Sequence, residues 1–337
     1  MKKQNGFVKT LKTLWGPLAV LAAMLIFLWI FTDTFMKYNN LMTIFKQVCV
    51  NGLLAAGITC ILIVGCIDLS IGSICAAAGC LVVVMNSVWG MNVWISILGA
   101  TLAAAIGAAL AYPASKLVFH FLSLATIAFG EVVFQLVAQS PGNITGNFTG
   151  IYTDYINLFG YRLKGFTNNY YFFLVITVAF LVVKQNMINS RVGRALAAIR
   201  ENSHAANGMG VNVRKYKVLA FAVSAFYTAY AGAMYAHLTR FICPDNFAYK
   251  QSVMFMTMLL FGGTASLAGP MVGVFSVQFL NEILRSAQKY QLLIYGVLML
   301  LVIVAMPGGV YGVYKDIVAN IKYKSAQKKA KKEEVKK

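Results

Sequence analysis

Residues 51–84 read NGLLAAGITCILIVGCIDLSIGSICAAAGCLVVV and contain one charged residue, Asp68. A helix that crosses the ~30 Å hydrocarbon core of a bilayer needs roughly 20 apolar residues. With the apolar residues that flank it, this stretch predicts two membrane spans, 44–65 and 69–88. The alternative is one long helix that is broken near Asp68.

The segment around Asp68 has the composition of a helix break. Gly65 and Gly72 bracket it, and Asp68 and Ser70 carry oxygens that can accept hydrogen bonds from the free backbone N–H groups of a restarting helix. Non-helical backbone at membrane depth needs such partners. The sequence therefore favours a capped helix restart at the cytoplasmic face over a carboxylate that binds substrate.

The composition of the whole chain extends this interpretation. Of its 337 residues, 59% are apolar and 12% are charged, and the mean hydropathy is +0.71. Soluble proteins carry about 25% charged residues, so an ordinary soluble enzyme is excluded. Because backbone groups in lipid must be satisfied internally and the alternation of a barrel strand is absent, we expect an all-α polytopic bundle.

Ten apolar stretches are candidate membrane helices, and because the last three are short, eight to ten is the defensible count. They cover residues 14–35, 44–65, 69–88, 92–112, 117–139, 169–188, 218–238, 248–265, 268–284 and 290–306.

Positive charge orients this bundle. The chain has 29 Lys and Arg against 10 Asp and Glu, and 19 of the cations lie before residue 14, between 189 and 217, or after 306. Cytoplasmic loops collect Lys and Arg, and ten spans place all three regions on that side, which predicts an N-in, C-in topology. The basic tail then faces membrane lipids rather than nucleic acid.

This topology divides the chain into three parts. We expect a cytoplasmic N-terminus at 1–13, a transmembrane permease domain at 14–306 and a basic cytoplasmic tail at 307–337. The domain carries a long external loop at 140–168 and a cytoplasmic loop at 189–217.

Small residues recur at every fourth position in four of the spans, so each set lines one face of a helix and predicts close helix packing. The sets are Gly52, Ala56 and Cys60; Gly72, Ala76 and Cys80; Gly99, Ala103, Gly107 and Ala111; and Ser224, Thr228, Gly232 and Ala236. All six cysteines lie in or beside apolar segments without metal-ligand spacing, which favours free buried thiols over a metal site.

Acidic residues inside apolar spans are costly, at about 2.5–3.5 kcal/mol each near the bilayer centre. Asp68, Glu131 and Glu282 should therefore face the bundle interior, a cavity or an interface. For Glu131 the sequence leaves two roles open, a place in a water-exposed pathway or a structural hydrogen bond to a neighbouring helix. Glu282 is expected at the outer end of its span.

The loop at 189–217 has the pattern of a docking element. Its small apolar residues mark the faces of short helices; Asn202 offers an N-cap, and Gly208 and Gly210 offer stops. A solvated loop that only sets topology is the alternative. The chain has no Gly-Lys dipeptide, hence no P-loop, and no catalytic constellation, so an ATPase would be another chain and no cofactor is expected.

In this loop the sequence resembles the permease subunits of ABC importers for branched-chain amino acids, within a group that includes ribose-type sugar permeases. The resemblance rests on GRALAAIREN (193–202), the Ala pair at 205–206, MGVNVRKYKVLAFAVSAFYTAYAGAMYAH (209–237), LATIAFGEVVFQLV (124–137), FGGTASLAGPMVG (261–273) and LLIYGVLMLLVIVAMPGGVYG (292–312). By contrast, GCIDLSIGS at 65–73 is more similar to the sugar permeases.

The resemblance implies an importer with two permease subunits, two cytoplasmic ATPase subunits and an external solute-binding protein, which would make most of the discrimination among solutes. It assigns ATPase coupling to Gly193, Arg194, Arg200, Glu201, Ala205, Ala206 and Gly210. It assigns the translocation pathway to Asp68, Ser70, Glu131 and Gln135.

Other substrates and another class stay open. A sugar or nucleoside importer would use the same machine, and a self-contained ion-coupled carrier or channel would use the two intramembrane acids Asp68 and Glu131. A membrane-bound enzyme would need a reactive constellation that the sequence does not offer.

Overall fold

The computed structural model describes residues 36–107, 119–158, 161–162, 166–247, 249–263, 268–284 and 289–306, with Ile26, 308–310, 312–313, 319 and 323 as isolated positions. The expected N-terminal segment 1–13, the expected first span 14–35 apart from Ile26, and most of the tail 307–337 lie outside these residues.

Each of the nine expected spans after the first coincides with a helix or, for 69–88, a helix continued by a π-helical turn. The helices of the bundle are α2 (Tyr38–Val64), α3 (Ile71–Val83) with its π-helical turn (Val84–Val88), α4 (Val93–Gly107), α6 (Phe119–Ala138), α7 (Phe166–Asn189), α10 (Val213–Thr239), α11 (Tyr249–Gly262), α12 (Ala268–Ile283) and α13 (Gln291–Ala305). Two short helices, α8 (Arg191–Glu201) and α9 (Ser203–Gly208), connect α7 to α10.

Five of these segments are long and apolar enough to cross a membrane. They are Tyr38–Val64, Ile71–Val88, Phe121–Ala138, Thr167–Asn189 and Val213–Thr239, and α4 and α13 contribute shorter apolar helices. The count of ten spans and the N-in, C-in orientation stay predictions.

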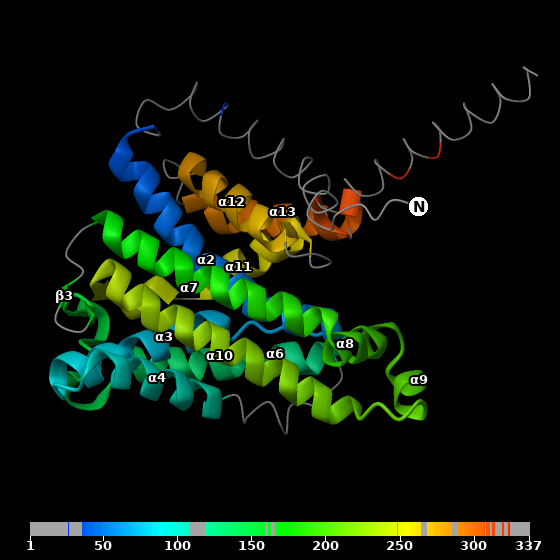
Figure 1. Ribbon diagram of the computed structural model, residues 1–337, viewed down its shortest axis with the longest axis horizontal. Helices are drawn as coiled ribbons and strands as arrows, with labels where there is room; N and C mark the ends of the chain where they lie inside the picture. Colours follow the sequence, from blue (N-terminus) through cyan, green and yellow to red (C-terminus); the bar gives the residue numbers. More distant parts are fainter. Residues whose placement is uncertain are drawn as a thin grey trace, which may run out of the picture.

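Helix α2 lies at the centre of the bundle. It contacts α7, α10, α11, α12 and α8, and α11 also contacts α3 directly. In Figure 1, α11, α12 and α13 lie on one side of the bundle and α3, α4, α6 and α10 on the other. Ala56, Ile58, Cys60 and Ile61 have no exposed surface. A helix that is apolar on every face needs such a buried position.

The predicted row of small residues on α10 forms a helix contact. Ser224, Thr228, Gly232 and Ala236 are all buried, and a Cβ placed on Gly232 would overlap the backbone carbonyl oxygen of Cys75 on α3. The contact therefore joins two backbones directly, as small residues permit between membrane helices.

The row on α4 departs from this pattern. Ala103 is exposed, Gly99 faces the flexible side chain of Met85, and Ala111 lies outside the described residues.

The helix break around Asp68 is confirmed, but the expected side-chain cap is not, because Ser70 is the N-cap residue of α3 and makes no side-chain capping hydrogen bond. Helix α2 ends at Gly65 in the left-handed conformation, with φ of +81°, and α3 begins at Ile71. One carboxylate oxygen of Asp68 accepts hydrogen bonds from the backbone N–H (2.9 Å) and the hydroxyl (2.6 Å) of Ser70. Neighbouring helices complete the segment: Leu69 N–H donates to the Thr126 hydroxyl on α6 at 3.2 Å.

The segment between α6 and α7 contains strands that the all-α prediction missed. Strand β1 (Ile151–Tyr152) pairs antiparallel with β4 (Phe241–Ile242), which follows α10, and β2 (Asn157–Leu158) pairs with β3 (Tyr161–Arg162). Two-residue strands are too short to produce an alternating pattern, so their absence from the prediction has a physical cause. The expected loop also ends sooner, because α7 begins at Phe166.

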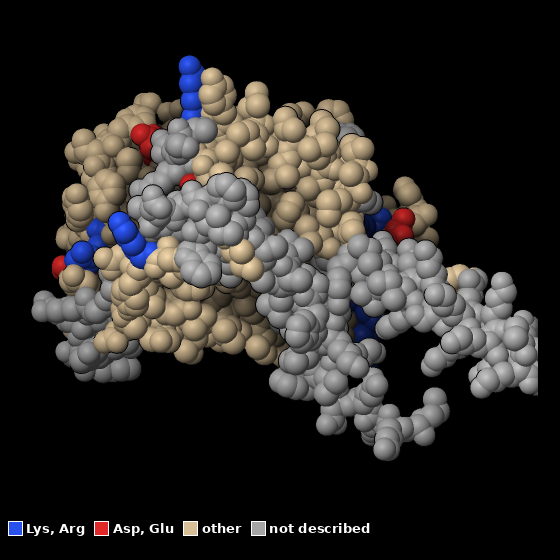
Figure 2. Space-filling view, turned by 90° about the horizontal axis from the view of Figure 1, so that it is seen from above, with Lys and Arg blue, Asp and Glu red and all other residues tan. Residues whose placement is uncertain are grey.

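Most of the surface that the described residues present in Figure 2 is uncharged. All six cysteines are free thiols; five are buried and Cys243 is partly exposed.

Candidate functional site

The exposed face of α6 carries polar side chains in the middle of a candidate span. Phe121, Leu124, Val132 and Leu136 are 57–64% exposed, and Glu131, which lies eleventh in the 18-residue span Phe121–Ala138, is exposed among them. At 100° per residue these positions cover one side of the helix.

Glu131 begins a ladder of hydrogen bonds along this face. The Gln135 amide donates from Nε2 to Glu131 Oε1 at 2.9 Å, and the Gln139 amide donates from Nε2 to Gln135 Oε1 at 3.0 Å. Each bond joins residues four apart, which are neighbours on a helix. The ladder extends from mid-span to the end of α6 and offers further donors and acceptors outward.

Other membrane helices have exposed faces of a different kind. On α7 the exposed residues from Tyr171 to Val183 are Tyr, Val and Ala, and on α13 every exposed residue from Leu292 to Ala305 is apolar or glycine. Such faces suit lipid. A carboxylate and two carboxamides do not, so the α6 face needs a cavity or a protein partner.

The helix break lies against the opposite side of α6. A Cβ on Gly130 would lie 3.3 Å from Ser70 Cα and 3.2 Å from Ser73 Oγ. Asp68 and Ser70 are 4% and 3% exposed and bind each other, whereas Glu131 and Gln135 face outward. The four predicted pathway residues are therefore on adjoining elements, but only the α6 pair lies on an open surface.

The second region is the α8–α9 segment, which projects from one end of the bundle (Figure 1). Side-chain oxygens cap all three helix starts here: Ser190 accepts from Val192 N, Asn202 from His204 N and Ala205 N, and Asn212 from Lys215 N. The predicted N-cap at Asn202 is confirmed. Gly208 ends α9, and Gly210 has a φ of +83°, as the predicted stops require.

Helix α8 is anchored to the ends of the long helices. Leu196 and Ile199 of α8 and Ala206 of α9 form one buried cluster with Ile61 of α2 and Phe221 of α10. A Cβ on Gly65, at the end of α2, would lie 3.2 Å from Arg200 Cγ. A displacement of α8 would therefore be transmitted to α2 and α10.

The structure divides the seven predicted coupling residues into two groups. Gly193 and Ala206 are buried, and Gly193 lies so close to the carbonyl of Ile188 that a side chain would not fit. They hold the segment in shape and do not present a surface to a partner. The remaining five are exposed: Arg194, Arg200, Glu201, Ala205 and Gly210.

Met209 is an exposed apolar residue that follows α9. Its side chain is 86% exposed, because the helix stops at Gly208 and the chain turns away. A large apolar side chain exposed at the tip of a projecting segment is typical of an interaction surface.

Sequence reasoning also missed a small polar cavity of about 90 Å³ inside the bundle. Carboxamides from three helices line it, among them Asn51, Gln251 and Gln278. Asn51 Nδ2 donates to Gln278 Oε1 at 3.1 Å, and Gln278 also contacts Gln47. This volume is large enough for several water molecules. The residues that form this cavity are isolated Asn and Gln residues on separate spans. Because they follow no regular spacing along the sequence, no sequence motif identifies the cavity.

Comparison with known proteins gives the family. The family model described as "Branched-chain amino acid transport system / permease component" matches residues 40–303. The high-affinity branched-chain amino acid transport system permease protein LivM of Escherichia coli (strain K12) is 25% identical over 270 residues, 73% of this chain. The chain spans 63% of the length of that relative.

A ribose relative and a solved structure also match. The ribose import permease protein RbsC of Escherichia coli (strain K12) is 26% identical over 287 residues, with 81% of this chain and 87% of the relative covered. PsaBC from Streptococcus pneumoniae, solved in complex with Fab, is 16% identical at a TM-score of 0.45, with 86% of this chain and 99% of that chain covered.

Nearly all of the helical bundle, from the start of α2 to the end of α13, thus lies within the match to the family model. The α6 face and the α8–α9 segment are both inside it. This chain is a multi-pass membrane protein that belongs to the family of branched-chain amino acid transport system permease components.

Proposed function

We propose that this chain is the permease subunit of an ATP-driven ABC importer and forms the translocation pathway for branched-chain amino acids, which an external solute-binding protein delivers. The observation that carries the proposal is the exposed carboxylate of Glu131 in the middle of a candidate span. Lipid disfavours a charge there, so the α6 face is covered by a second permease subunit, and the solute passes between the two.

The chemistry of the α6 face supports an aliphatic amino acid. Glu131 offers one carboxylate to an ammonium group, and the amides of Gln135 and Gln139 can donate to a carboxylate. Leu124, Val132 and Leu136 surround these groups with apolar surface that suits a branched side chain. The similarity to LivM, which is named for branched-chain amino acids, points the same way.

A ribose-type sugar is the second candidate substrate. One observation favours it: the alignment with RbsC covers 87% of that relative, against 63% for LivM. The carboxylate and the two carboxamides of the α6 face could also hydrogen-bond a polyhydroxylated solute, but a sugar has no ammonium group to pair with Glu131.

In this proposal α8 and α9 lie in the cytoplasm and dock into a groove on one of the two ATPase subunits. Their contacts with α2 and α10 would carry a rigid-body movement into the bundle when the ATPases close on ATP. The bundle then alternates between two helix packings of similar energy, and the partners bias the equilibrium between them.

Replacing Arg200 and Glu201 together with Ala tests the coupling. Both side chains are exposed at the end of α8, so the fold should be retained, and we expect weaker co-purification of the ATPases or ATP hydrolysis without uptake. The matched control is the double replacement of Asp245 and Lys289, two exposed charges outside α8 and α9. An unchanged complex with unchanged uptake would contradict the coupling role, and uptake by vesicles without ATPases would point to a self-contained carrier.

Binding measurements on the cognate solute-binding protein test the substrate. We expect leucine, isoleucine and valine to bind in calorimetry and ribose and galactose to give no heat, because discrimination in such a system resides mainly outside the membrane. Tight sugar binding with no response to the amino acids would contradict the proposal of a branched-chain amino acid and support a ribose-type sugar as the substrate.

A further inference from the structure

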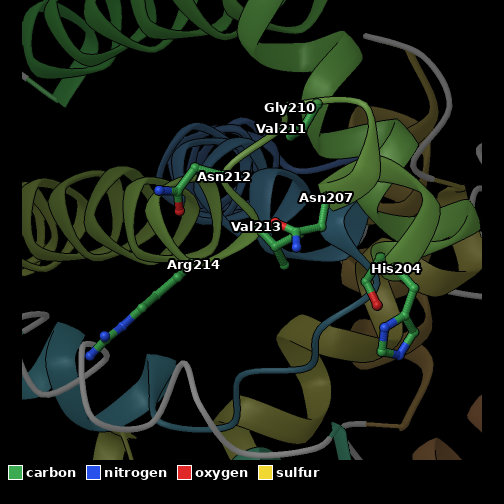
Figure 3. A pocket seen from close by; sticks show the side chains of 8 residues that line it. His204, Asn207, Gly210, Val211, Asn212, Val213 and Arg214 are labelled. Atoms are coloured by element: carbon green, nitrogen blue, oxygen red, sulfur yellow. The ribbon is translucent and has the colours of Figure 1, made fainter.

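A groove of about 690 Å³ lies beside the turn between α9 and α10. Figure 3 shows the side chains of Arg214 and His204 on opposite sides of it, with Asn207 and Val213 between them. The groove belongs to the same end of the bundle as the exposed coupling residues. A partner that binds α8 and α9 would meet it.

The polar lining of the groove favours an anion. Arg214 supplies a guanidinium, which only donates hydrogen bonds and pairs with carboxylates in a two-pronged geometry. His204, Asn207 and Asn212 add an imidazole and two carboxamides, and none of the described residues that line the groove is acidic. The groove is therefore matched in charge to an acidic side chain rather than to a basic one.

The surface around the groove has the same sign. Arg194, Arg200, Lys215 and Lys217 are on or next to the α8–α9 segment, and Glu201 is the one acidic residue between 189 and 217. A protein that binds here with complementary potential must present an acidic surface.

We propose that the groove receives a carboxylate side chain, Asp or Glu, of the cytoplasmic ATPase subunit. This inference rests on the proposed function. It adds a second direction to the contact: the permease inserts α8 and α9 into its partner, and the partner inserts an acidic side chain beside Arg214. Such an interlock would fix the register of the two proteins, because Arg recognises a carboxylate with defined geometry.

The test measures ATPase binding to the purified full-length permease with Arg214→Glu, and with Lys215→Glu as its matched control. Both variants change the net charge equally, but Lys215 is exposed and is absent from the groove lining. We expect Arg214→Glu to weaken binding about tenfold or more, and Lys215→Glu to weaken it by less than about threefold. Asn207→Asp is an isosteric change on the exposed side of α9, so it should leave the fold unchanged. It should also weaken ATPase binding, because it places a negative charge in the groove, and it therefore tests the inference even if Arg214→Glu does not fold.

The binding is measured in detergent and again in vesicles with and without an anionic lipid. The expected losses should appear in all three conditions. Equal losses of ATPase binding for Arg214→Glu and Lys215→Glu would overturn the inference, because they would show that the net positive charge of this surface, and not the groove, determines the binding. Losses confined to anionic vesicles would overturn it in favour of a lipid headgroup. If the wild-type chain binds no ATPase at all, the proposed function fails together with this inference.

Discussion

Replacing Glu131 with Leu is expected to lower solute uptake about a hundredfold while the permease stays assembled with its partners. The carboxylate lies in the middle of the α6 span, on a face that is open in the single chain. Where a second permease covers that face, the surroundings are of low dielectric, and a cationic group on the solute loses its only charged partner among the exposed residues of this helix.

Glu131→Gln separates charge from hydrogen bonding. The amide keeps an oxygen that can accept from Gln135 Nε2, so the ladder along α6 is retained. We expect uptake to fall about tenfold, less than for Leu, because the ion–dipole contact that remains is weaker than an ion pair. Uptake of labelled leucine into vesicles that contain the full complex is the measurement.

Glu282→Gln is the control for this pair, because it removes the same charge at the end of α12, away from the α6 face. It should leave uptake within about twofold of wild type. If the α6 face were in contact with lipid, replacing Glu131 with Leu would instead stabilise the protein, by about 2.5–3.5 kcal/mol on insertion scales. A more stable Glu131→Leu protein with normal uptake would show that α6 faces lipid and does not line the pathway.

Replacing Gly232 with Ala is expected to destabilise the bundle by about 1–3 kcal/mol, the range for overpacking a close-packed interior. The new methyl group would overlap the carbonyl oxygen of Cys75 and lie 2.9 Å from its carbonyl carbon. These are backbone atoms, so no rotamer change can relieve the overlap, and α10 must move away from α3. Leu at this position should prevent folding.

The matched control is Gly296→Ala on α13. A Cβ at Gly296 has no neighbour within 4 Å, and both positions lie inside helices. Since Ala is favoured over Gly in a helix by about 1 kcal/mol, this change should leave the protein unaffected or slightly more stable. Thermal unfolding in detergent, followed by size-exclusion chromatography, measures both. Equal stability of the two variants would mean that α3 and α10 do not touch at Gly232.

The helices and the break at Asp68 could be predicted because their causes are local. Apolar runs of sufficient length specify spans wherever they occur, and the hydrogen bond from Ser70 N–H to Asp68 within the break joins residues two apart. Likewise, the caps at Asn202 and Asn212 reach only two or three residues along the chain. Interactions between residues this close together can be identified from the sequence of a short segment.

The sites could be predicted only in part. The sequence identified Glu131 as a costly acid, but it left open whether the side chain bonds to a neighbouring helix or faces outward. Within the part of the chain that the structure describes, this side chain bonds to Gln135 on the same helix and not to a neighbouring one, and the face is open. Among the coupling residues, Ala206 could not be distinguished from Arg194 and Arg200 by pattern, because its burial depends on where α2 and α10 end. Gly193 is packed against the carbonyl of Ile188 instead, where α7 turns into α8.

The sequence by itself determined that this chain is a helical membrane protein, roughly where its described helices lie, and that the segment between α7 and α10 is basic. Only the tertiary structure decided which faces stay open, that β1 pairs with β4 across 91 positions, from Ile151 to Ile242, and that Arg214 lines a groove. The reason is that hydropathy and capping depend on neighbours along the chain. Exposure and shape depend on contacts between residues far apart in it, which no run of consecutive residues contains.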